Sequence, residues 1–297
     1  MNKKNQLSAL QKRNNLSGFI FLLPLIIIFI CLMGYSFYFL IRYSFFDVTI
    51  AFKEPEFVGF SNFQMVLKDS QFYRALFNTF LLSSANIFFG LTIAFLIAVF
   101  LNFSIPGKRF FHALFFVPSM LPIALMAAVF NTMLQYKDGL VNNILRAVGL
   151  DFLAQRWLAD PNLAMFSIMS VSLFLIGIPI MYYTADLTTI SSSILEAATI
   201  DGARMKDILI FILYPMLKNT HKTIILSMIL GGFREMDRVF LMTDGGPGGV
   251  TEIVGTYIYR SFKTPGANLG RICAISVLVA IISFTIGFVQ MRAKDKS

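Results

Sequence analysis

The chain has 297 residues, a formal net charge of +9 and a mean hydropathy of +0.71. Hydrophobic residues make up 57% of it and charged residues only 14%, which leaves too few polar side chains to cover a soluble globule of this length. The composition therefore predicts an integral membrane protein, and attraction to lipid headgroups accounts for the positive charge without a nucleic-acid partner.

Apolar runs of roughly 20 residues, long enough to cross a bilayer as helices, recur along the chain. They cover Leu16 to Ile41, Leu76 to Leu101, Phe110 to Leu134, Leu163 to Ala185, Thr223 to Met242 and Ile272 to Met291. We therefore predict an all-α integral membrane protein with six transmembrane helices in residues 16–292, flanked by tails at 1–15 and 293–297. The first run is too long for a signal peptide and lacks a small-residue cleavage site, so we expect it to remain as a helix.

The distribution of basic residues indicates the orientation. Segments on the same side as the N-terminus are denser in Lys and Arg than segments on the opposite side, and this excess is typical of cytoplasmic loops. Both tails and the polar stretch from Ser191 to Asn219 are therefore expected in the cytoplasm.

Polar and helix-breaking residues interrupt the second and third runs. Asn78, Thr79 and Asn86 can hydrogen-bond across helices, a role that we favour over contact with a solute. Pro118 and Pro122 remove backbone hydrogen bonds and are expected to bend the third helix. Bent helices often line a path through a membrane protein, because the freed carbonyls need a polar environment.

The outer half of the fifth run carries four charged side chains, which are costly in contact with lipid. They are Arg234, Glu235, Asp237 and Arg238. Helical spacing would pair the first with the third and the second with the fourth, so the charges can neutralise one another. They are expected either to line a translocation path or its outer gate, or to form a structural ion-pair cluster, and the sequence favours neither alternative.

The sequence contains no pattern typical of an enzyme, a metal site or a cofactor site. Cys31 and Cys273 both lie in apolar runs, and His112 and His221 lack the spacing of metal ligands. The glycine-rich stretch from Asp244 to Gly249 lacks the Gly-Lys-Ser/Thr ending of a phosphate-binding loop and is expected outside, so it predicts a tight re-entrant turn or a surface turn.

The longest polar interruption, residues 191–219, has a helical pattern of its own. Ser193 followed by Glu196 is typical of a capping box, so a short helix is expected to begin there. Asp201 and Gly202 would end that helix at an elbow, and a second helix is expected from Ala203. From these residues alone, a helix-turn-helix arm and an amphipathic connector on the membrane surface are equally good interpretations.

This stretch also carries a family motif. The run Glu196-Ala197-Ala198-x-x-Asp201-Gly202-Ala203, followed by a basic helix and Leu213-x-Pro215, resembles the Glu-Ala-Ala loop of permease subunits of binding-protein-dependent ABC importers. Met236-Asp237 and the stretch from Thr243 to Gly249, with Thr251-Glu252 and Tyr257 to Tyr259 after it, resemble the sugar-carrying, maltose-permease branch. Agreement at Val58-Gly59, Asn62-Phe63, Asn78-Thr79, Phe116 to Pro118 and Gly139 to Asn142 extends the resemblance over nearly the whole chain. The chain departs from the family pattern at Leu209, Asn219, Met236 and Arg238, and the last of these adds charge near the expected path.

The resemblance implies a mechanism and a set of partners. The loop would act as a coupling helix in a cleft of a cytosolic ABC ATPase dimer, through Glu196, Ala197, Ala198, Asp201, Gly202 and Ala203. A second permease subunit would complete the pathway, and an extracellular solute-binding protein would deliver a sugar or sugar-like solute, expected to be an oligosaccharide. The candidate path or gate residues are Arg234, Glu235, Asp237, Arg238 and Pro118, and no cofactor is expected.

The sequence thus predicts a permease subunit in the bacterial cytoplasmic membrane, with both termini in the cytoplasm and no enzymatic activity of its own. The alternative is a self-sufficient secondary transporter or channel for small polar solutes. That class usually shows internal repeats and paired broken helices, which are not evident here. A membrane enzyme is third, because no catalytic set is present.

Overall fold

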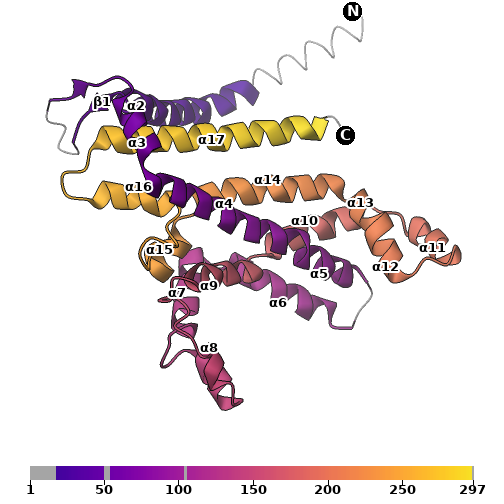
Figure 1. Cartoon of the computed structure of the whole chain (residues 1–297). Helices are drawn as coiled ribbons and strands as arrows, with labels where there is room; N and C mark the ends of the chain where they lie inside the picture. Colours follow the sequence, from indigo (N-terminus) through magenta and orange to yellow (C-terminus); the bar gives the residue numbers. More distant parts are fainter. Residues whose placement is uncertain (1–17, 50–53, 104–105, 296–297) are drawn as a thin grey trace, which may run out of the picture. The chain divides into compact units, whose positions relative to one another are not determined.

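The computed structural model describes residues 18–49, 54–103 and 106–295, and Figure 1 shows its helices and strands. The N-terminal tail at 1–15, with the first residues of the first apolar run, lies outside the described residues. The chain divides into two compact units, one formed by residues up to 67 together with 264–278, the other by 68–263 together with the chain from 279 onward.

The first unit contains the first apolar helix and a small ribbon. Its elements are the helix Gly18–Tyr43, which includes the π-helical segment η1 (Ile30–Gly34) and α2 (Tyr35–Tyr43), the strands β1 (Phe46–Asp47) and β2 (Glu56–Phe57), α3 (Ser61–Lys68) and the first part of α17 (Leu269–Asp295). The strands pair antiparallel, with Phe46 opposite Phe57. The fully buried Asn62 donates to the carbonyls of Ser44 and Phe46 at 3.0 and 2.9 Å, so its amide has a structural role.

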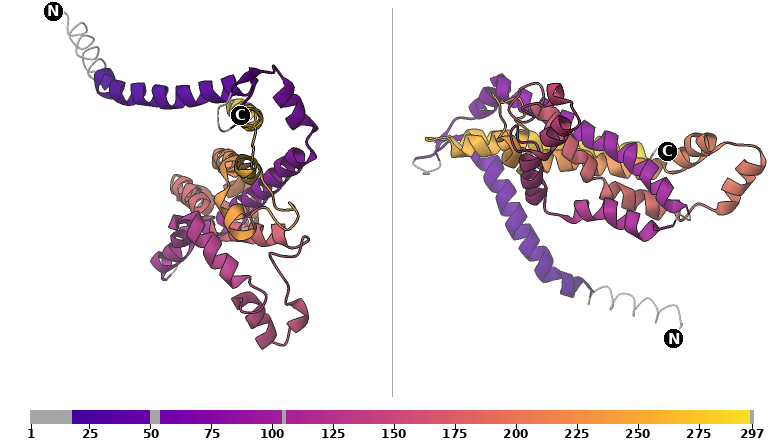
Figure 2. Two further views of the ribbon diagram at one scale, coloured as in Figure 1. Left: turned by 90° about the vertical axis from the view of Figure 1, so that its left-hand side faces the viewer. Right: turned by 90° about the horizontal axis from the view of Figure 1, so that it is seen from below.

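The second unit is a helical bundle from which two segments extend (Figure 2). Its helices are α4 (Ser70–Leu91), α5 (Ile93–Asn102), α6 (Lys108–Met120), α7 (Ile123–Met133), α8 (Leu140–Ala147), η2 (Asp151–Leu153), α9 (Ala164–Ser170), η3 (Val171–Phe174), α10 (Gly177–Leu187), α11 (Ser192–Ile200), α12 (Met205–Asp207), η4 (Ile208–Leu213), α13 (Tyr214–Met216), α14 (Lys218–Arg234), α15 (Asp237–Thr243) and α16 (Val254–Lys263). Figures 1 and 2 show α8 extending at one end and α11 with α12 extending at another.

Four helical segments of the described chain are long and apolar enough to cross a membrane. They are Gly18–Tyr43, Ser70–Asn102, Ala164–Leu187 and Leu269–Arg292, and they cover the first, second, fourth and sixth predicted runs. The third run is the pair α6 and α7, which meet at a bend of 99°. Pro118 lies in the last turn of α6 and Pro122 is the N-cap of α7, so the prolines break the helix as expected.

The fifth predicted run is not one continuous helix. The 17-residue α14 ends at Arg234, Glu235 is extended with φ −69° and ψ 132°, and α15 begins at Asp237. The prediction of one continuous helix from Thr223 to Met242 is therefore wrong. The predicted pairing of Arg234 with Asp237 is also wrong, because the break at Glu235 interrupts the helical spacing. Neither side chain forms an ion pair with a described residue.

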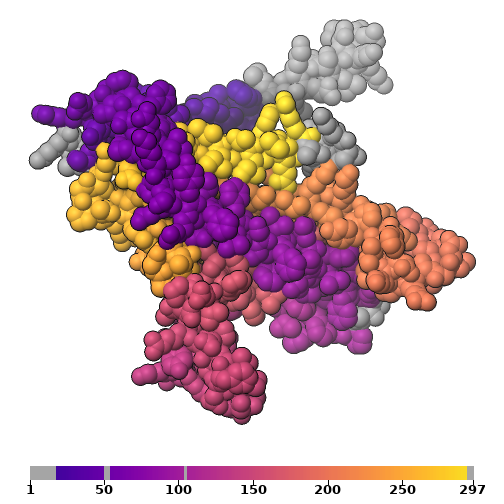
Figure 3. Space-filling model, in the orientation of Figure 1, coloured from indigo at the N-terminus to yellow at the C-terminus, as the bar shows by residue number. Residues whose placement is uncertain are grey.

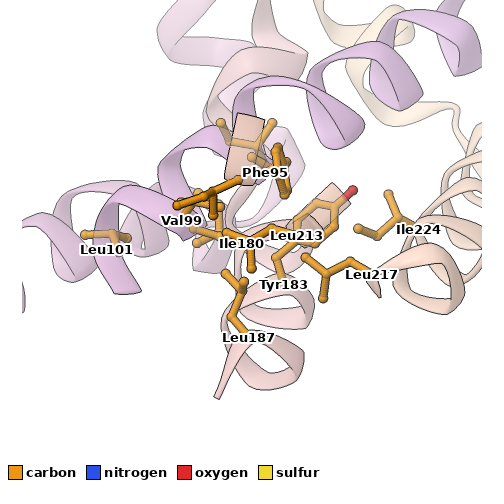
Figure 4. Packing of buried hydrophobic residues seen from close by; sticks show 13 residues of the cluster. Phe95, Val99, Leu101, Ile180, Tyr183, Leu187, Leu213, Leu217 and Ile224 are labelled. Carbon is orange, nitrogen blue, oxygen red and sulfur yellow. The ribbon is translucent and has the colours of Figure 1, made fainter. Parts of the chain in front are cut away.

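One apolar cluster joins several helices of the second unit (Figure 4). It contains Phe95 and Val99 of α5, Ile180, Tyr183 and Leu187 of α10, Leu213 of η4, Leu217, and Ile224 of α14. Burial of these side chains is the main term that fixes α5, α10 and α14 against one another. A second cluster joins α4, α7, α9 and α15 around the buried Leu82, Ala127, Ile168 and Val239.

A buried amide fastens the glycine-rich turn to α4. Asn78 donates to the carbonyls of Val250 and Glu252 at 2.9 and 2.8 Å, so it holds a loop and not a neighbouring helix. The side chain of Glu252 points inward, where burial raises the pKa of its carboxyl and the facing Arg260 guanidinium partly offsets that rise. The turn predicted for Asp244 to Gly249 is present, with positive φ at Asp244, Gly245, Gly248 and Gly249.

Candidate functional site

The stretch from Ser191 to Leu217 forms a folded arm between α10 and α14, visible as the orange protrusion in Figure 3. Its first helix, α11, begins at Ser192 and is capped by Ser191, whose hydroxyl accepts the N–H of Ser193 at 3.4 Å. The cap is thus two residues earlier than the predicted capping box of Ser193 and Glu196. The reason is that Ser191 has the extended backbone of an N-cap, whereas Ser193 is already inside the first turn.

The predicted elbow is a helix terminus of defined geometry. Gly202 has φ +81°, its N–H donates to the carbonyl of Thr199 at 3.1 Å, and the N–H of Ala203 reaches back to Ala198 at 2.9 Å. These two bonds form a Schellman motif, in which glycine is favoured because the left-handed conformation is strained for residues with a Cβ. The next helix begins at Met205, two residues later than predicted, and the Asp207 carboxylate accepts the N–H of Arg204 at 3.1 Å.

The arm has an inner and an outer face. Leu195, Ala198 and Ala203 are half-buried and pack against the apolar cluster of α5, α10 and α14. The outer face carries Glu196, Ala197, Ile200, Asp201 and Gly202, all exposed. Ile200 is 86% exposed, so the outer face presents one large apolar side chain between small and acidic ones.

A second candidate site, called the polar cavity below, is a space of about 390 Å³ inside the bundle, lined by polar side chains together with Leu175, Ile176, Ile178 and Met228. This volume falls within the roughly 300–1,000 Å³ of small-molecule sites. Its polar lining is Asn86 of α4, Ser119 of α6, Ser172 of η3, Tyr182 of α10, Ser227 of α14, Glu235 and Arg238. The cavity therefore presents hydroxyls, an amide and an ion pair from six elements of the second unit.

Breaks in the helices give the cavity its polar wall. The Ser119 hydroxyl, next to Pro118, accepts the N–H of Gly177 at 2.8 Å, and a Cβ on Gly177 would lie only 2.5 Å from that oxygen. This close approach joins the end of α6 to the start of α10, just after the 3-10 segment η3. Non-helical backbone at membrane depth is tolerated where it lines a cavity or is covered by protein, and both conditions hold here.

The charged pair of the cavity is tightly held. The fully buried Arg238 donates from Nε and NH2 to the two carboxylate oxygens of Glu235, at 3.0 and 2.8 Å, and from NH1 to Ser172 Oγ at 2.8 Å. The Glu235 side chain is 14% exposed. The bidentate pair is therefore electrically neutral and bridges the break between α14 and α15 while it contacts the bend of the fourth span.

The remaining polar groups of the cavity are open to a ligand. The Asn86 amide and the Tyr182 hydroxyl form no hydrogen bond with another residue of the described chain. They approach the cavity from two different helices. A molecule with several hydroxyl groups could satisfy both, because the amide both donates and accepts and the phenol can do either.

Comparisons with known proteins agree with this geometry. No protein-family model matches the chain. The multiple sugar-binding transport system permease protein MsmF of Streptococcus mutans is 30% identical over 256 residues, which are 86% of this chain and 87% of that one. The chain belongs to the permease subunits of ABC sugar transporters.

Solved structures agree with this assignment. The permease matches a chain in the crystal structure of a bacterial ABC transporter involved in the import of the acidic polysaccharide alginate, with a TM-score of 0.80, 25% identity, and 98% and 99% of the two chains covered. It also matches one from the alginate transporter in complex with an alginate pentasaccharide-bound periplasmic protein, with a TM-score of 0.77, 26% identity, and 94% and 93% covered. The bundle is thus an ABC importer permease fold.

The structure of the permease separates the predicted site residues into groups. Glu235 and Arg238 line the cavity, Pro118 precedes the cavity residue Ser119, and Arg234 and Asp237 are exposed and outside the lining. In the arm, Ala198 and Ala203 face inward, whereas the other four predicted coupling residues face outward.

Two groups of residues escaped sequence reasoning. Ile200 lies four residues after Glu196 and three after Ala197, so helical spacing could have identified it as part of the outer face. Ser119, Ser172 and Tyr182 could not have been identified. The helix bends that bring them to one cavity are not marked in the nearby sequence, apart from the prolines.

Arg238→Met tests the role of the buried pair in stability. The substitution leaves the Glu235 carboxylate buried without its partner, so we expect the free energy of unfolding to fall by about 3–5 kcal/mol. Replacing Glu235 by Met as well removes the stranded charge and should recover most of the loss. Thermal unfolding of the purified protein in detergent measures both effects, with the exposed Arg234→Met as control. Unchanged unfolding of Arg238→Met would show that the pair carries no stability.

Proposed function

We propose that this chain is one half of the transmembrane pathway of an ATP-driven importer for a sugar or sugar-like solute, and that this solute is an oligosaccharide. A second, similar permease subunit supplies the other half. A cytosolic ABC ATPase dimer hydrolyses ATP, and an extracellular binding protein delivers the solute. The observation that carries the proposal is the match to a sugar-transport permease over 86% of the chain.

The relatives support the proposed solute and partners. The name of MsmF refers to a multiple sugar-binding transport system, and the alginate transporter was crystallised with a periplasmic protein that holds a pentasaccharide. A similar delivery protein and a chain of several sugar units are therefore proposed here. The membrane is the bacterial cytoplasmic membrane, with both termini in the cytoplasm, as the distribution of Lys and Arg favours.

The proposed topology has six crossings, and α14 is the short one. Its 17 residues give roughly 25 Å of helix at 1.5 Å per residue, somewhat less than the hydrocarbon thickness of about 30 Å. Glu235 and α15 would cross the rest of the hydrocarbon layer. There Glu235 lines the cavity, and α15 packs in the second apolar cluster, with Leu82 and Ile168.

The polar cavity is the proposed section of the solute path in this subunit. Asn86 and Tyr182 would hydrogen-bond sugar hydroxyls, and the partly exposed Glu235 carboxylate would offer a further acceptor. Carbohydrates suit such a site because each hydroxyl both donates and accepts. Neutral hydrogen bonds of this kind bind the solute weakly enough that it can be released, which a translocation path requires.

The outer face of the arm is the proposed site of coupling to the ATPase. Ala197 and Gly202 are small and permit close approach, Ile200 offers an apolar contact, and Glu196 and Asp201 offer carboxylates to basic groups. ATP-driven closure of the ATPase dimer would push the arm and change the exposure of the path between the two sides of the membrane.

Reconstitution tests the proposed class directly. Proteoliposomes with the permease pair, the ATPase and the binding protein should accumulate solute only when ATP is present. Uptake by this chain alone, driven by an ion gradient, would instead show the secondary transporter that is the alternative.

Asn86→Leu tests the path. The substitution keeps the size of the side chain and removes its hydrogen bonds, so solute uptake at limiting concentration should fall about two- to tenfold, the worth of one neutral hydrogen bond. Ser84→Ala, on the same helix with its hydroxyl bonded to the Phe80 carbonyl, is the control. Unaltered uptake by Asn86→Leu would exclude the amide from the path.

Gly202→Asp tests the coupling face, and Gly149 provides a matched control. Both glycines follow helices in Schellman motifs, with φ +81° and +78°, and a Cβ on either would meet no atom of the chain within 4 Å. The two substitutions therefore carry the same backbone cost. Only Gly202→Asp should abolish solute-dependent ATP hydrolysis and weaken co-purification of the ATPase. Equal effects of Gly202→Asp and Gly149→Asp on ATP hydrolysis would refute a docking role for the elbow.

A further inference from the structure

The imidazole of His221 lies where the two ends of the arm meet the bundle. Its Nδ1 lies 2.7 Å from the hydroxyl of Tyr183 on α10, the helix that leads into the arm. Its Nε2 lies 2.8 Å from the carbonyl oxygen of Tyr214 on α13, the last helix of the arm. His221 itself is buried in the first turn of α14.

The partners indicate which ring nitrogen carries the hydrogen of the neutral imidazole. A backbone carbonyl only accepts, so Nε2 carries the hydrogen and donates it to Tyr214. In the neutral imidazole, Nδ1 then accepts the hydrogen of the Tyr183 hydroxyl. The neutral imidazole thus connects a side chain before the arm to the backbone at its end, with both nitrogens used.

This connection spans a weak point in the backbone. Pro215 has no N–H for the carbonyl of Phe211, and the preceding segment η4 is a π-helix. Leu217 then leaves the helical conformation, with φ −89° and ψ 18°, before α14 begins at Lys218. A chain interrupted in this way can bend at Leu217 unless something else holds its two sides together.

Neighbouring contacts hold the same place. The Thr220 hydroxyl donates to the Asp186 carboxylate, a second link between α14 and α10. The ring of Phe95 packs edge-to-face against Tyr183, Tyr214 and His221, with centroid distances of 5.5, 5.3 and 6.3 Å. The two ends of the arm are therefore fixed to one point of the apolar cluster.

We propose that His221 is a positioning residue for energy coupling: it prevents bending at Leu217, so that displacement of the arm moves α10 and α14. Displacement of the arm can move α10 and α14 only if the junction between the arm and these helices does not bend. With the imidazole bonds removed, the break at Leu217 would absorb part of the movement. This inference rests on the proposed coupling function and adds to it the element that transmits the motion.

Two substitutions test the connection in the complete transporter, reconstituted with its ATPase, partner permease and binding protein. Tyr183→Phe removes one hydroxyl and keeps the ring, and His221→Leu removes both imidazole bonds while filling an apolar environment. Solute imported per ATP hydrolysed should fall by about two- to thirtyfold, the range found when residues of a coupled network are replaced. Basal ATP hydrolysis should continue, with less stimulation by the loaded binding protein.

The controls separate coupling from folding. Thr223→Val, which removes an exposed hydroxyl bonded to Asn219 one turn away on the same helix, should leave the import-to-ATP ratio unchanged. The double variant Tyr183→Phe/His221→Leu should match His221→Leu alone, because His221→Leu already removes the hydrogen bond that Tyr183→Phe would remove. Lower thermal stability with an unchanged import-to-ATP ratio would overturn the inference and leave His221 a purely structural residue.

The outcome also differs from a failure of the proposed function. If that function is wrong, the wild-type complex itself shows no ATP-dependent import. If only the present inference is wrong, the wild type imports solute and both variants import it with the same ratio to ATP.

Discussion

Apolar contact between the arm and the cluster of α5, α10 and α14 is the interaction on which the rest of the structure depends. Leu195, Ala198 and Ala203 contribute the inner face of the arm, and Leu213 and Leu217 continue it into the bundle. Hydrophobic burial is not directional, so on its own it would hold the arm without fixing its angle. The hydrogen bonds of His221 and Asp186 supply the missing direction at the base.

The same contact leaves the outer face of the arm exposed. Glu196, Ala197 and Ile200 are exposed because Leu195 and Ala198, on the other side of α11, are occupied with the chain's own core. Breaks in the helices near Pro118 and at Glu235 bring polar groups to the polar cavity. Among these groups, Glu235 and Ser172 are satisfied by their hydrogen bonds with Arg238.

Hydropathy and local motifs predicted much of this arrangement. Four apolar runs correspond to the four long apolar helical segments, the prolines mark the bend of the third run, and Gly202 has the predicted positive φ, because each of these features depends on residues close in sequence. The end of α14 at Arg234 escaped prediction, since the apolar pattern continues past it into α15. The contacts of Tyr183 with His221 and of Asn78 with Val250 join distant segments and emerge only from tertiary packing.

The central claim is that the arm and the helices it packs against move as one body. Distance measurement between spin labels on Met205→Cys in α12 and Met181→Cys in α10, both exposed, tests it most directly when Cys31 and Cys273 are replaced by serine and the complex remains active in transport. The same distance distribution with and without ATP is the predicted result. A distance that changes when ATP binds would mean that the arm bends at its base, and would contradict the claim.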